Sequence, residues 1–462
     1  MSSEWHQVSL KEVTSVLGDG LHGTPAYDPN GDHFFINGNN LNNGKIAFNA
    51  NTKRVSAIEA AKHKKNLTDR TILVSINGTL GNVAFYAGEK VVLGKSACYF
   101  NVKAGVDKQF IRYVIDSEIF QGYIQNLATG STIKNVSLKL MRDFQFSLPP
   151  IDLQQRISAT LSCLDDRITL LRETNTTLEA IAQALFKSWF VDFDPVCAKM
   201  EGRAPEGMDE ATAALFPNGF EESELGLVPE GWQPLSVSEV AEIVKGKSYS
   251  SKDLVDKHET ALVTLKSFAR GGGFRLDGFK PYSGTYKASQ IVQSGDLIVA
   301  YTDVTQAAEL IGKPAIVIGV DEYKTLVASL DVGIIRPLTA KVSRQFLYGL
   351  FNTDAFQAHT LSHTSGTTVL HLSKDGVGSY RFACSPISVV EAFSTIAESL
   401  TSRQQVNIDQ MRNLAILRDT LLPRLISGQL RLPEAEALPE EAFALSPPAV
   451  PRSLCPKATP TG

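Results

Sequence analysis

The chain has 462 residues, of which 20% are charged, and its formal net charge at pH 7 is −4. This length predicts roughly three domains, and no apolar run reaches the roughly 18 residues that a membrane-spanning helix needs. The first residues lack the layout of a signal peptide and the five scattered cysteines form no C-x-x-C pair, so we expect a cytoplasmic protein without a disulfide framework or a zinc ribbon.

Acidic residues are concentrated outside the strand-rich parts of the chain. Residues 1–148 hold 16 lysines and arginines against 12 aspartates and glutamates, and residues 231–385 hold 16 against 14, whereas residues 149–230 hold 6 against 15. Mildly basic segments can present surfaces to phosphates, because the distribution of charge matters more than its total. Ordinary solvated surfaces would give the same distribution, so charge alone does not decide between the two.

Residues 1–148 have the pattern of strands and turns. Short apolar runs rich in β-branched residues, at 71–76, 82–86 and 91–93, are separated by glycine, asparagine and proline, as in strands joined by tight connections. Residues 110–127 have a helical pattern that Gly130 ends. We therefore predict a strand-rich α+β domain over this segment.

The hydrophobic period changes after Pro149-Pro150. Over residues 149–195, apolar residues recur at alternating spacings of four and three, which is the heptad pattern of a coiled-coil helix. The predicted seam consists of Ile157, Leu161, Leu164, Ile168, Leu171, Asn175, Leu178 and Leu185. A helix over residues 152–190 would be roughly 58 Å long, since an α-helix rises 1.5 Å per residue.

Residues 231–385 repeat the strand pattern, with runs at 261–265, 296–300 and 315–318 and a helical stretch at 343–358. A second heptad pattern follows over residues 386–431. Its more polar seam consists of Phe393, Leu400, Asn407, Met411, Leu414 and Leu421. An asparagine at a seam position fixes register or partner choice at some cost in stability, so we expect the two helices to pair. Two amphipathic helices that each cover their own domain are the alternative.

Two segments have the composition of irregular chain. Residues 196–230 are rich in proline, glycine and glutamate and predict a linker loop. Residues 432–462 are rich in proline and carry few large apolar residues, which predicts a disordered tail.

The chain also matches itself. The offset that aligns Gly130 with Gly366 also aligns Pro150 with Pro386, and the match runs without a gap from 130 to 190. A slightly shorter offset aligns Trp5 with Trp232. Because this period is far longer than that of solenoid repeats, each copy is expected to fold with its own core.

Motifs for catalysis are weak. Lys245-Gly246-Lys247-Ser248 ends like a phosphate-binding loop but lacks its first glycine, and Asp192-Phe193-Asp194-Pro195 lacks the second proline and the aromatic of an adenine methyltransferase motif. Three histidines, His359, His363 and His371, have no cysteine or clear carboxylate beside them to complete a metal site. We therefore expect neither catalytic residues nor a metal; an NTPase that uses Lys247-Ser248 is the alternative.

The order of these parts resembles the specificity subunit of type I restriction-modification systems, over about residues 1–431. The matching motifs are DGLHGTPAY at 19–27, LPPI at 148–151, FKSWFVDFDP at 186–195, GDLIVAYTD at 295–303 and LRDTLLPRLISG at 417–428. Each motif is weak alone, whereas their order, spacing and duplication together are specific.

The resemblance implies two α+β target recognition domains, residues 1–148 and 231–385, that each read one half of an asymmetric bipartite DNA site. The helices would pair as an antiparallel coiled coil. They would hold the two recognition domains roughly 50–60 Å apart, so the two half-sites would be separated by more than one turn of B-DNA. Implied partners are double-stranded DNA, two adenine-N6 modification methyltransferase subunits and restriction translocase and endonuclease subunits, with no membrane. The chain would be non-catalytic and without a cofactor; S-adenosylmethionine, ATP and Mg would belong to the partner subunits. A stand-alone DNA-binding or scaffold protein is the alternative.

Loop residues are the candidates for DNA contact, since asparagine and glutamine pair with adenine, arginine and lysine with guanine, and lysine, serine and threonine with phosphates. In the first domain we predict His22, Thr24, Tyr27, Asn77, Thr79, Lys95 and Lys134. In the second domain we predict Lys247, Tyr249, Lys266, Arg270, Arg275, Thr302 and Gln306.

Overall fold

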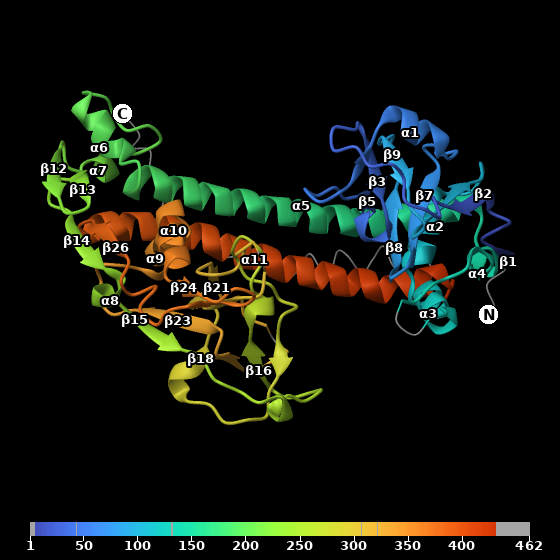
Figure 1. Cartoon of the computed structure of the whole chain (residues 1–462). Helices are drawn as coiled ribbons and strands as arrows, with labels where there is room; N and C mark the ends of the chain where they lie inside the picture. Colours follow the sequence, from blue (N-terminus) through green and yellow to red (C-terminus); the bar gives the residue numbers. More distant parts are fainter. Residues whose placement is uncertain (1–4, 43, 131–132, 306, 321, 431–462) are drawn as a thin grey trace, which may run out of the picture. The chain divides into compact units, whose positions relative to one another are not determined.

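The computed structural model describes residues 5–42, 44–130, 133–305, 307–320 and 322–430 and has an α+β fold (Figure 1). The chain divides into two compact units. Unit 1 holds the described residues up to Leu170 and from Gln410 onward, and unit 2 holds Leu171–Asp409. The two longest helices, α5 (Ile151–Phe190) and α11 (Ile387–Ile426), each contribute one half to each unit.

Unit 1 is built mainly from short strands. They are β1 (His6–Ser9), β2 (Thr14–Asp19), β3 (His33–Ile36), β4 (Leu41–Asn42), β5 (Lys45–Ile46), β6 (Arg54–Val55), β7 (Thr71–Asn77), β8 (Thr79–Phe85), β9 (Val91–Leu93), β10 (Ala97–Val102) and β11 (Gln145–Leu148). The shorter helices of this unit are η1 (Gly38–Asn40), α1 (Ala57–Lys62), α2 (Lys108–Asp116), α3 (Glu118–Leu127) and α4 (Leu138–Asp143).

The main sheet of unit 1 has the strand order β2-β10-β7-β8, with all neighbours antiparallel. A second sheet, β6-β3-β9, contains the parallel pair β3 and β9. Six consecutive residues of β7, from Thr71 to Ile76, are buried. A continuous apolar run is the pattern of a strand that is covered on both faces, so β7 lies at the centre of this core.

Unit 2 begins with the α5 half and short elements of the connecting segment. They are α6 (Asp194–Met200), α7 (Glu210–Ala213), β12 (Phe220–Ser223) and β13 (Gly226–Pro229). The strands that follow are β14 (Gln233–Ser236), β15 (Ala241–Lys245), β16 (Thr260–Val263), β17 (Lys280–Pro281), β18 (Ile291–Val292), β19 (Leu297–Ala300), β20 (Thr302–Asp303), β21 (Pro314–Ile316), β22 (Thr325–Ala328), β23 (Val332–Pro337), β24 (Thr364–Ser365), β25 (Leu370–Leu372) and β26 (Arg381–Cys384). The helices are α8 (Val237–Val240), η2 (Ser251–Asp253), η3 (Leu265–Ser267), η4 (Ala288–Gln290), α9 (Arg344–Phe351) and α10 (Asp354–Ser362).

The main sheet of unit 2 has the order β15-β23-β19-β21, which repeats the order found in unit 1. Its second sheet again contains one parallel pair, β16 and β22. Local details recur as well: Gln121 Nε2 donates to the carbonyls of Ile115 at 2.8 Å and Gly81 at 3.2 Å. Gln357, the counterpart of Gln121 in the second copy, donates to the equivalent carbonyls at 2.6 and 3.1 Å. The two units therefore share a backbone frame in which the side chains differ.

The long helices are held to the strand-rich part of each unit by matching hydrogen bonds. In unit 1, Ser158 of α5 donates to Asp107, the N-cap of α2, at 2.6 Å. In unit 2, Ser394 of α11 donates to Ser343, the N-cap of α9, at 2.7 Å. Both residues of the second pair lie at the repeat offset from those of the first, so the duplicated sequence places each long helix against the equivalent helix of its domain, α2 or α9.

Most of the residues predicted for the helix seams are buried. They are Ile157, Leu161, Leu164, Ile168, Leu171, Phe393, Asn407, Leu414 and Leu421. The remaining seam positions, Asn175, Leu178, Leu185, Leu400 and Met411, are half-buried. Among the described residues, no helix is both long and apolar enough to cross a membrane.

Three segments differ from the sequence prediction. The helical stretches expected at 110–127 and 343–358 each divide into two helices, because Ser117 and Thr353 interrupt them and cap the second helix with their side chains. Residues 196–230, predicted as a linker loop, contain most of α6, all of α7 and the hairpin of β12 and β13. The tail predicted at 432–462 lies outside the described residues.

Candidate nucleic-acid interface

The loop after β2 carries three of the predicted contact residues of unit 1, namely His22, Thr24 and Tyr27, and all three are exposed. His22 Nε2 lies 2.6 Å from Asp19 Oδ2, and the Tyr27 ring packs edge-on against Phe35 with centroids 5.8 Å apart. These contacts place an imidazole and a phenol at the surface on a loop that is held at both ends.

A buried carboxylate supports this loop from below. Glu59 of α1 accepts from the Ala26 amide at 3.2 Å and from Lys62 Nζ at 2.8 Å, and it contacts His63 at 3.1 Å. The hydrogen bond from Lys62, followed by those from Ala26 and His63, lowers the pKa of Glu59 to about 2. The charged form of Glu59 therefore fixes the backbone beside Tyr27.

The equivalent loop of unit 2 begins with the same close approach of backbones. A Cβ on Gly20 would lie 2.2 Å from the Leu93 carbonyl oxygen, and one on Gly246 would lie 2.0 Å from that of Ser329. Only glycine fits at either position. Lys247, which follows Gly246, is half-buried, and its amide donates to the Ala328 carbonyl at 2.7 Å.

The other predicted residues of unit 1 lie in two places. Asn77 and Thr79 flank the turn of the β7–β8 hairpin, where the Gly78 amide donates to the Lys134 carbonyl at 3.0 Å. This hydrogen bond brings Asn77, Thr79 and Lys134 together. Lys95 lies apart from them, exposed in the turn between β9 and β10.

In unit 2 the two predicted arginines are paired with acids. Arg270 lies 3.3 Å from Glu309, and Arg275 Nε donates to Asp277 at 2.9 Å. Lys266 is exposed in η3, and Tyr249 has the Lys280 ammonium 5.9 Å from its ring centroid. Paired surface cations remain available to phosphates, since exposed ion pairs contribute little stability and exchange readily. Lys266, Arg270 and Arg275 share one hydrogen-bonded loop, in which the Arg275 amide donates to the Ser267 carbonyl at 2.8 Å.

Thr302 is the prediction that the structure corrects. It lies in β20 and is 6% exposed, and its hydroxyl lies 3.4 Å from His371 Nδ1. Pairing of β20 with β25 buries it, so this threonine presents almost no surface to a ligand. Gln306 lies outside the described residues.

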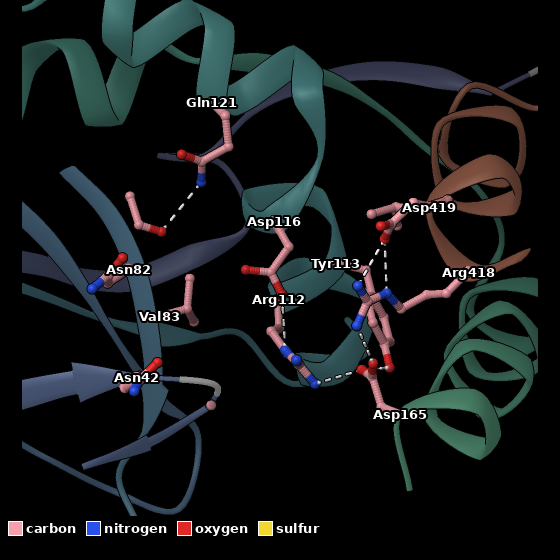
Figure 2. Close-up of a pocket in the computed structure, with 13 residues that line it drawn as sticks. Asn42, Asn82, Val83, Arg112, Tyr113, Asp116, Gln121, Asp165, Arg418 and Asp419 are labelled. Carbon is pink, nitrogen blue, oxygen red and sulfur yellow. Dashed lines mark hydrogen bonds and ion pairs between the residues drawn. The ribbon is translucent and has the colours of Figure 1, made fainter. Parts of the chain in front are cut away.

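Sequence reasoning missed a polar cavity of about 320 Å³ in unit 1, lined by residues of β4, β8, α2, α3, α5 and α11 (Figure 2). Asp165 of α5 joins the charged side chains on one side of this cavity. It accepts from Tyr113 Oη at 2.9 Å and from Arg418 Nη1 at 2.9 Å, and it lies 3.2 Å from Arg112 Nη1. Arg112 also donates to Asp116 at 3.0 Å.

Burial controls the ionisation of this cluster. It raises the pKa of Tyr113 to about 12 and raises the pKa of Asp116 against the opposing effect of Arg112. Tyr113 therefore stays a neutral donor, and each arginine faces at least one carboxylate. Such mutual neutralisation suits an anchor between α2 and the long helices rather than a site for acid–base chemistry.

Unit 2 has a version of the same anchor in which uncharged donors replace the arginines. Tyr348, which the repeat offset places at the position of Arg112, donates from its hydroxyl to Glu179 of α5 at 2.8 Å. Glu179 also accepts from Gln404 of α11 at 3.3 Å. In both units, a residue of the equivalent helix, α2 or α9, thus reaches a carboxylate on α5 that also binds α11.

The histidines considered for a metal site do not converge. The rings of His359 and His363 are 4.1 Å apart, while His371 faces Thr302. Within the described part of the chain, no group of three or more His, Cys, Asp or Glu side chains could hold a metal ion.

Comparison with known proteins relates these features to one family. Residues 2–180 match the family model of the type I restriction modification DNA specificity domain. The chain is 23% identical over 449 residues to the type I restriction enzyme MjaIX specificity subunit of Methanocaldococcus jannaschii, a match that covers 93% of this chain and 94% of that protein. It is 24% identical over 375 residues to the HindI specificity subunit of Haemophilus influenzae, covering 70% and 77% of the two chains.

A solved structure shares the fold. The crystal structure of a type I restriction-modification system S subunit from M. genitalium superposes with a TM-score of 0.51 at 16% identity. The superposition covers 92% of this chain and 96% of that one. At this level of identity the likeness concerns the fold alone.

Proposed function

We propose that the two recognition domains of this chain, which resembles type I restriction-modification specificity subunits along most of its length, each read one half of an asymmetric, bipartite DNA site. The observation that carries this proposal is the duplicated frame, with the strand orders β2-β10-β7-β8 and β15-β23-β19-β21. Two domains with one backbone plan but different loop residues would bind the same kind of ligand and read different bases.

The long helices would serve as the spacer, paired as an antiparallel coiled coil. Residue numbers fall along α11 as they rise along α5: Asp165 contacts Arg418 in unit 1, and Glu179 contacts Gln404 in unit 2. This order supports antiparallel pairing. Asn407, which is fully buried, donates to Asn175 at 2.7 Å, as expected of polar seam residues that set the register.

The chemistry would be supplied by partner subunits. We propose that the chain docks two adenine-N6 modification methyltransferase subunits, and through them restriction translocase and endonuclease subunits. S-adenosylmethionine would bind to the former, and ATP and Mg to the latter. The weak catalytic motifs of this sequence support a non-catalytic role for this chain.

Contact with DNA would come from loop residues that are exposed or half-buried. In the first domain these are His22, Thr24, Tyr27, Asn77, Thr79, Lys95 and Lys134. In the second domain they are Lys247, Tyr249, Lys266, Arg270 and Arg275. The lysines and arginines would position the domains on phosphates, and the side chains at loop tips would reach base edges.

The proposal is tested by producing the chain with its host's modification methyltransferase subunit in a strain that lacks other type I systems, and mapping methylated adenines by single-molecule sequencing. We expect one methylated motif made of two different half-sites at a fixed spacing, present only when this chain is produced. A contiguous motif, or no new motif although the two proteins copurify, would contradict it. Tight binding to one site by the chain alone would favour a stand-alone DNA-binding protein.

A further inference from the structure

In unit 1 the tip of the β7–β8 hairpin is joined to the segment that follows α3. Asn77 pairs with Asn135, and Asn135 pairs in turn with Thr129. The Asn77 amide Nδ2 donates to Asn135 Oδ1 at 3.2 Å. The segment turns at Gly130, whose φ of 103° suits glycine because other residues rarely adopt it.

Unit 2 repeats this junction contact by contact. Thr302 pairs with His371, and His371 pairs with Ser365. The Thr302 hydroxyl lies 3.4 Å from His371 Nδ1, and the turn again contains a glycine, Gly366, with a φ of 107°. His371 follows Gly366 at the same spacing at which Asn135 follows the glycine of unit 1. We call each junction the tip–turn surface of its unit.

Both tip–turn surfaces expose an apolar residue, but their polar side chains differ. An apolar residue lies open at one equivalent position in both turns, Ile133 at 61% and Val369 at 36% exposure. Asn135 is half-buried and His371 is exposed. An exposed β-branched side chain in each turn offers the kind of apolar contact that a thymine methyl group makes in the major groove.

The tips also account for a length difference between the domains. Gly81 in unit 1 and Gly312 in unit 2 are equivalent, because each accepts a hydrogen bond from the matching glutamine, Gln121 or Gln357. Gly81 comes four positions after Asn77, whereas Gly312 comes ten positions after Thr302. The longer tip is held from inside, because the buried Asp303 carboxylate accepts from the Leu310 and Ile311 amides at 2.6 and 3.0 Å. Variation in length and residues at a supported tip is what a reading loop requires.

We propose that each tip–turn surface reads base edges of double-stranded DNA, and that Asn135 and His371 are specificity-determining residues of the two half-sites. This inference rests on the proposed function and names the surface that performs it. Asn135 accepts from Asn77 through Oδ1, and among the described residues its Nδ2 group has no partner. An asparagine amide matches adenine in the major groove, and a histidine ring can donate to or accept from a base.

The test uses the full chain in complex with the modification methyltransferase subunit. Asn135→Asp keeps the oxygen that accepts from Asn77 but replaces the Nδ2 donor by an acceptor, so folding is preserved while the pattern offered to a base is inverted. We expect methylation of the cognate site to lose about tenfold in preference over one particular single-base variant. Only the half-site read by unit 1 should be affected.

His371→Asn is the reciprocal variant and should relax one position in the other half-site only. Asn126→Ala, at an exposed position on α3, serves as the control and should change neither half-site. A uniform loss of methylation at unchanged preference for every base would assign Asn135 and His371 a purely structural role and overturn the inference. If the unaltered chain directs methylation to no bipartite site, the proposed function itself is wrong. If the unaltered chain does so but the two variants keep its base preferences, only the role of the tip–turn surfaces is wrong.

Discussion

Replacing Asp165 by alanine removes the carboxylate that joins α2, α5 and α11 in unit 1. Three donors lose their shared acceptor: Tyr113 and Arg418 at 2.9 Å and Arg112 at 3.2 Å. Hydrogen bonds to a charged group contribute about 1.5–3 kcal/mol each, but they are not additive. The two arginines keep the carboxylates of Asp116 and Asp419, which reduces the cost of leaving them unpaired.

We therefore expect Asp165→Ala to lower the free energy of unfolding by about 2–3 kcal/mol. For a unit of this size that corresponds to a fall of about 4–12 °C in the melting temperature of the transition that reports unit 1. Scanning calorimetry measures this shift, and hydrogen exchange of the α2 amides measures the local opening. Asp166→Ala removes the same charge from the exposed neighbouring position and should stay within about 0.5 kcal/mol of the unaltered chain.

A double-mutant cycle with Arg418→Ala separates pairing from general damage. The carboxylate and the guanidinium should be coupled by about 1 kcal/mol or more, because both groups are less than one third exposed. If the losses of unfolding free energy for Asp165→Ala and Arg418→Ala simply add, the two groups are not coupled. If Asp165→Ala costs no more than Asp166→Ala, Asp165 does not join the three helices.

Three further predictions concern the two long helices and the loop after β2. The double variant Asn175→Leu and Asn407→Leu removes the amide pair of the seam, in which the buried Asn407 Oδ1 has no hydrogen-bond partner among the described residues. It should raise the melting temperature while allowing self-association, seen as dimer by light scattering, and a less stable monomer would contradict it. Leu164→Asp places a charge at a position that is 3% exposed and should abolish copurification with the methyltransferase subunit; an intact complex would count against the seam. Glu59, whose pKa is lowered from 4.5 to about 2, stabilises the fold above pH 4.5 and loses this contribution as the pH falls towards 2. The difference in melting temperature between the unaltered chain and Glu59→Gln should therefore shrink over that range, and a constant difference would exclude the carboxylate as its cause.

The sequence predicts those parts of the fold that depend on local pattern. The start and end of α5 lie close to the predicted helix, since its heptads and flanking prolines are local signals. The division at Ser117 escapes prediction because a serine within an apolar helical pattern acts as an N-cap only when the chain turns there. Thr302 follows a strand and precedes an aspartate, as a loop residue would, yet a distant strand covers it.

The polar cavity could not be predicted from local pattern. Asp165 and Arg418 are 253 residues apart in the sequence, and nothing near either residue indicates the other. An arginine at a heptad position is the only local signal, and it is equally typical of a solvated helix face. The pairing of Asn135 with Asn77 is similarly non-local, which is why the sequence identified the hairpin tip but not the turn beside it.

The central claim is that two domains on one frame read the two half-sites independently. It is tested most directly by exchanging residues 231–385 for the corresponding segment of another family member and mapping methylated adenines with the same methyltransferase subunit. We predict that one half-site changes to that of the donor while the other half-site and the spacing are retained. A change in both halves, or an unchanged motif, would contradict the account.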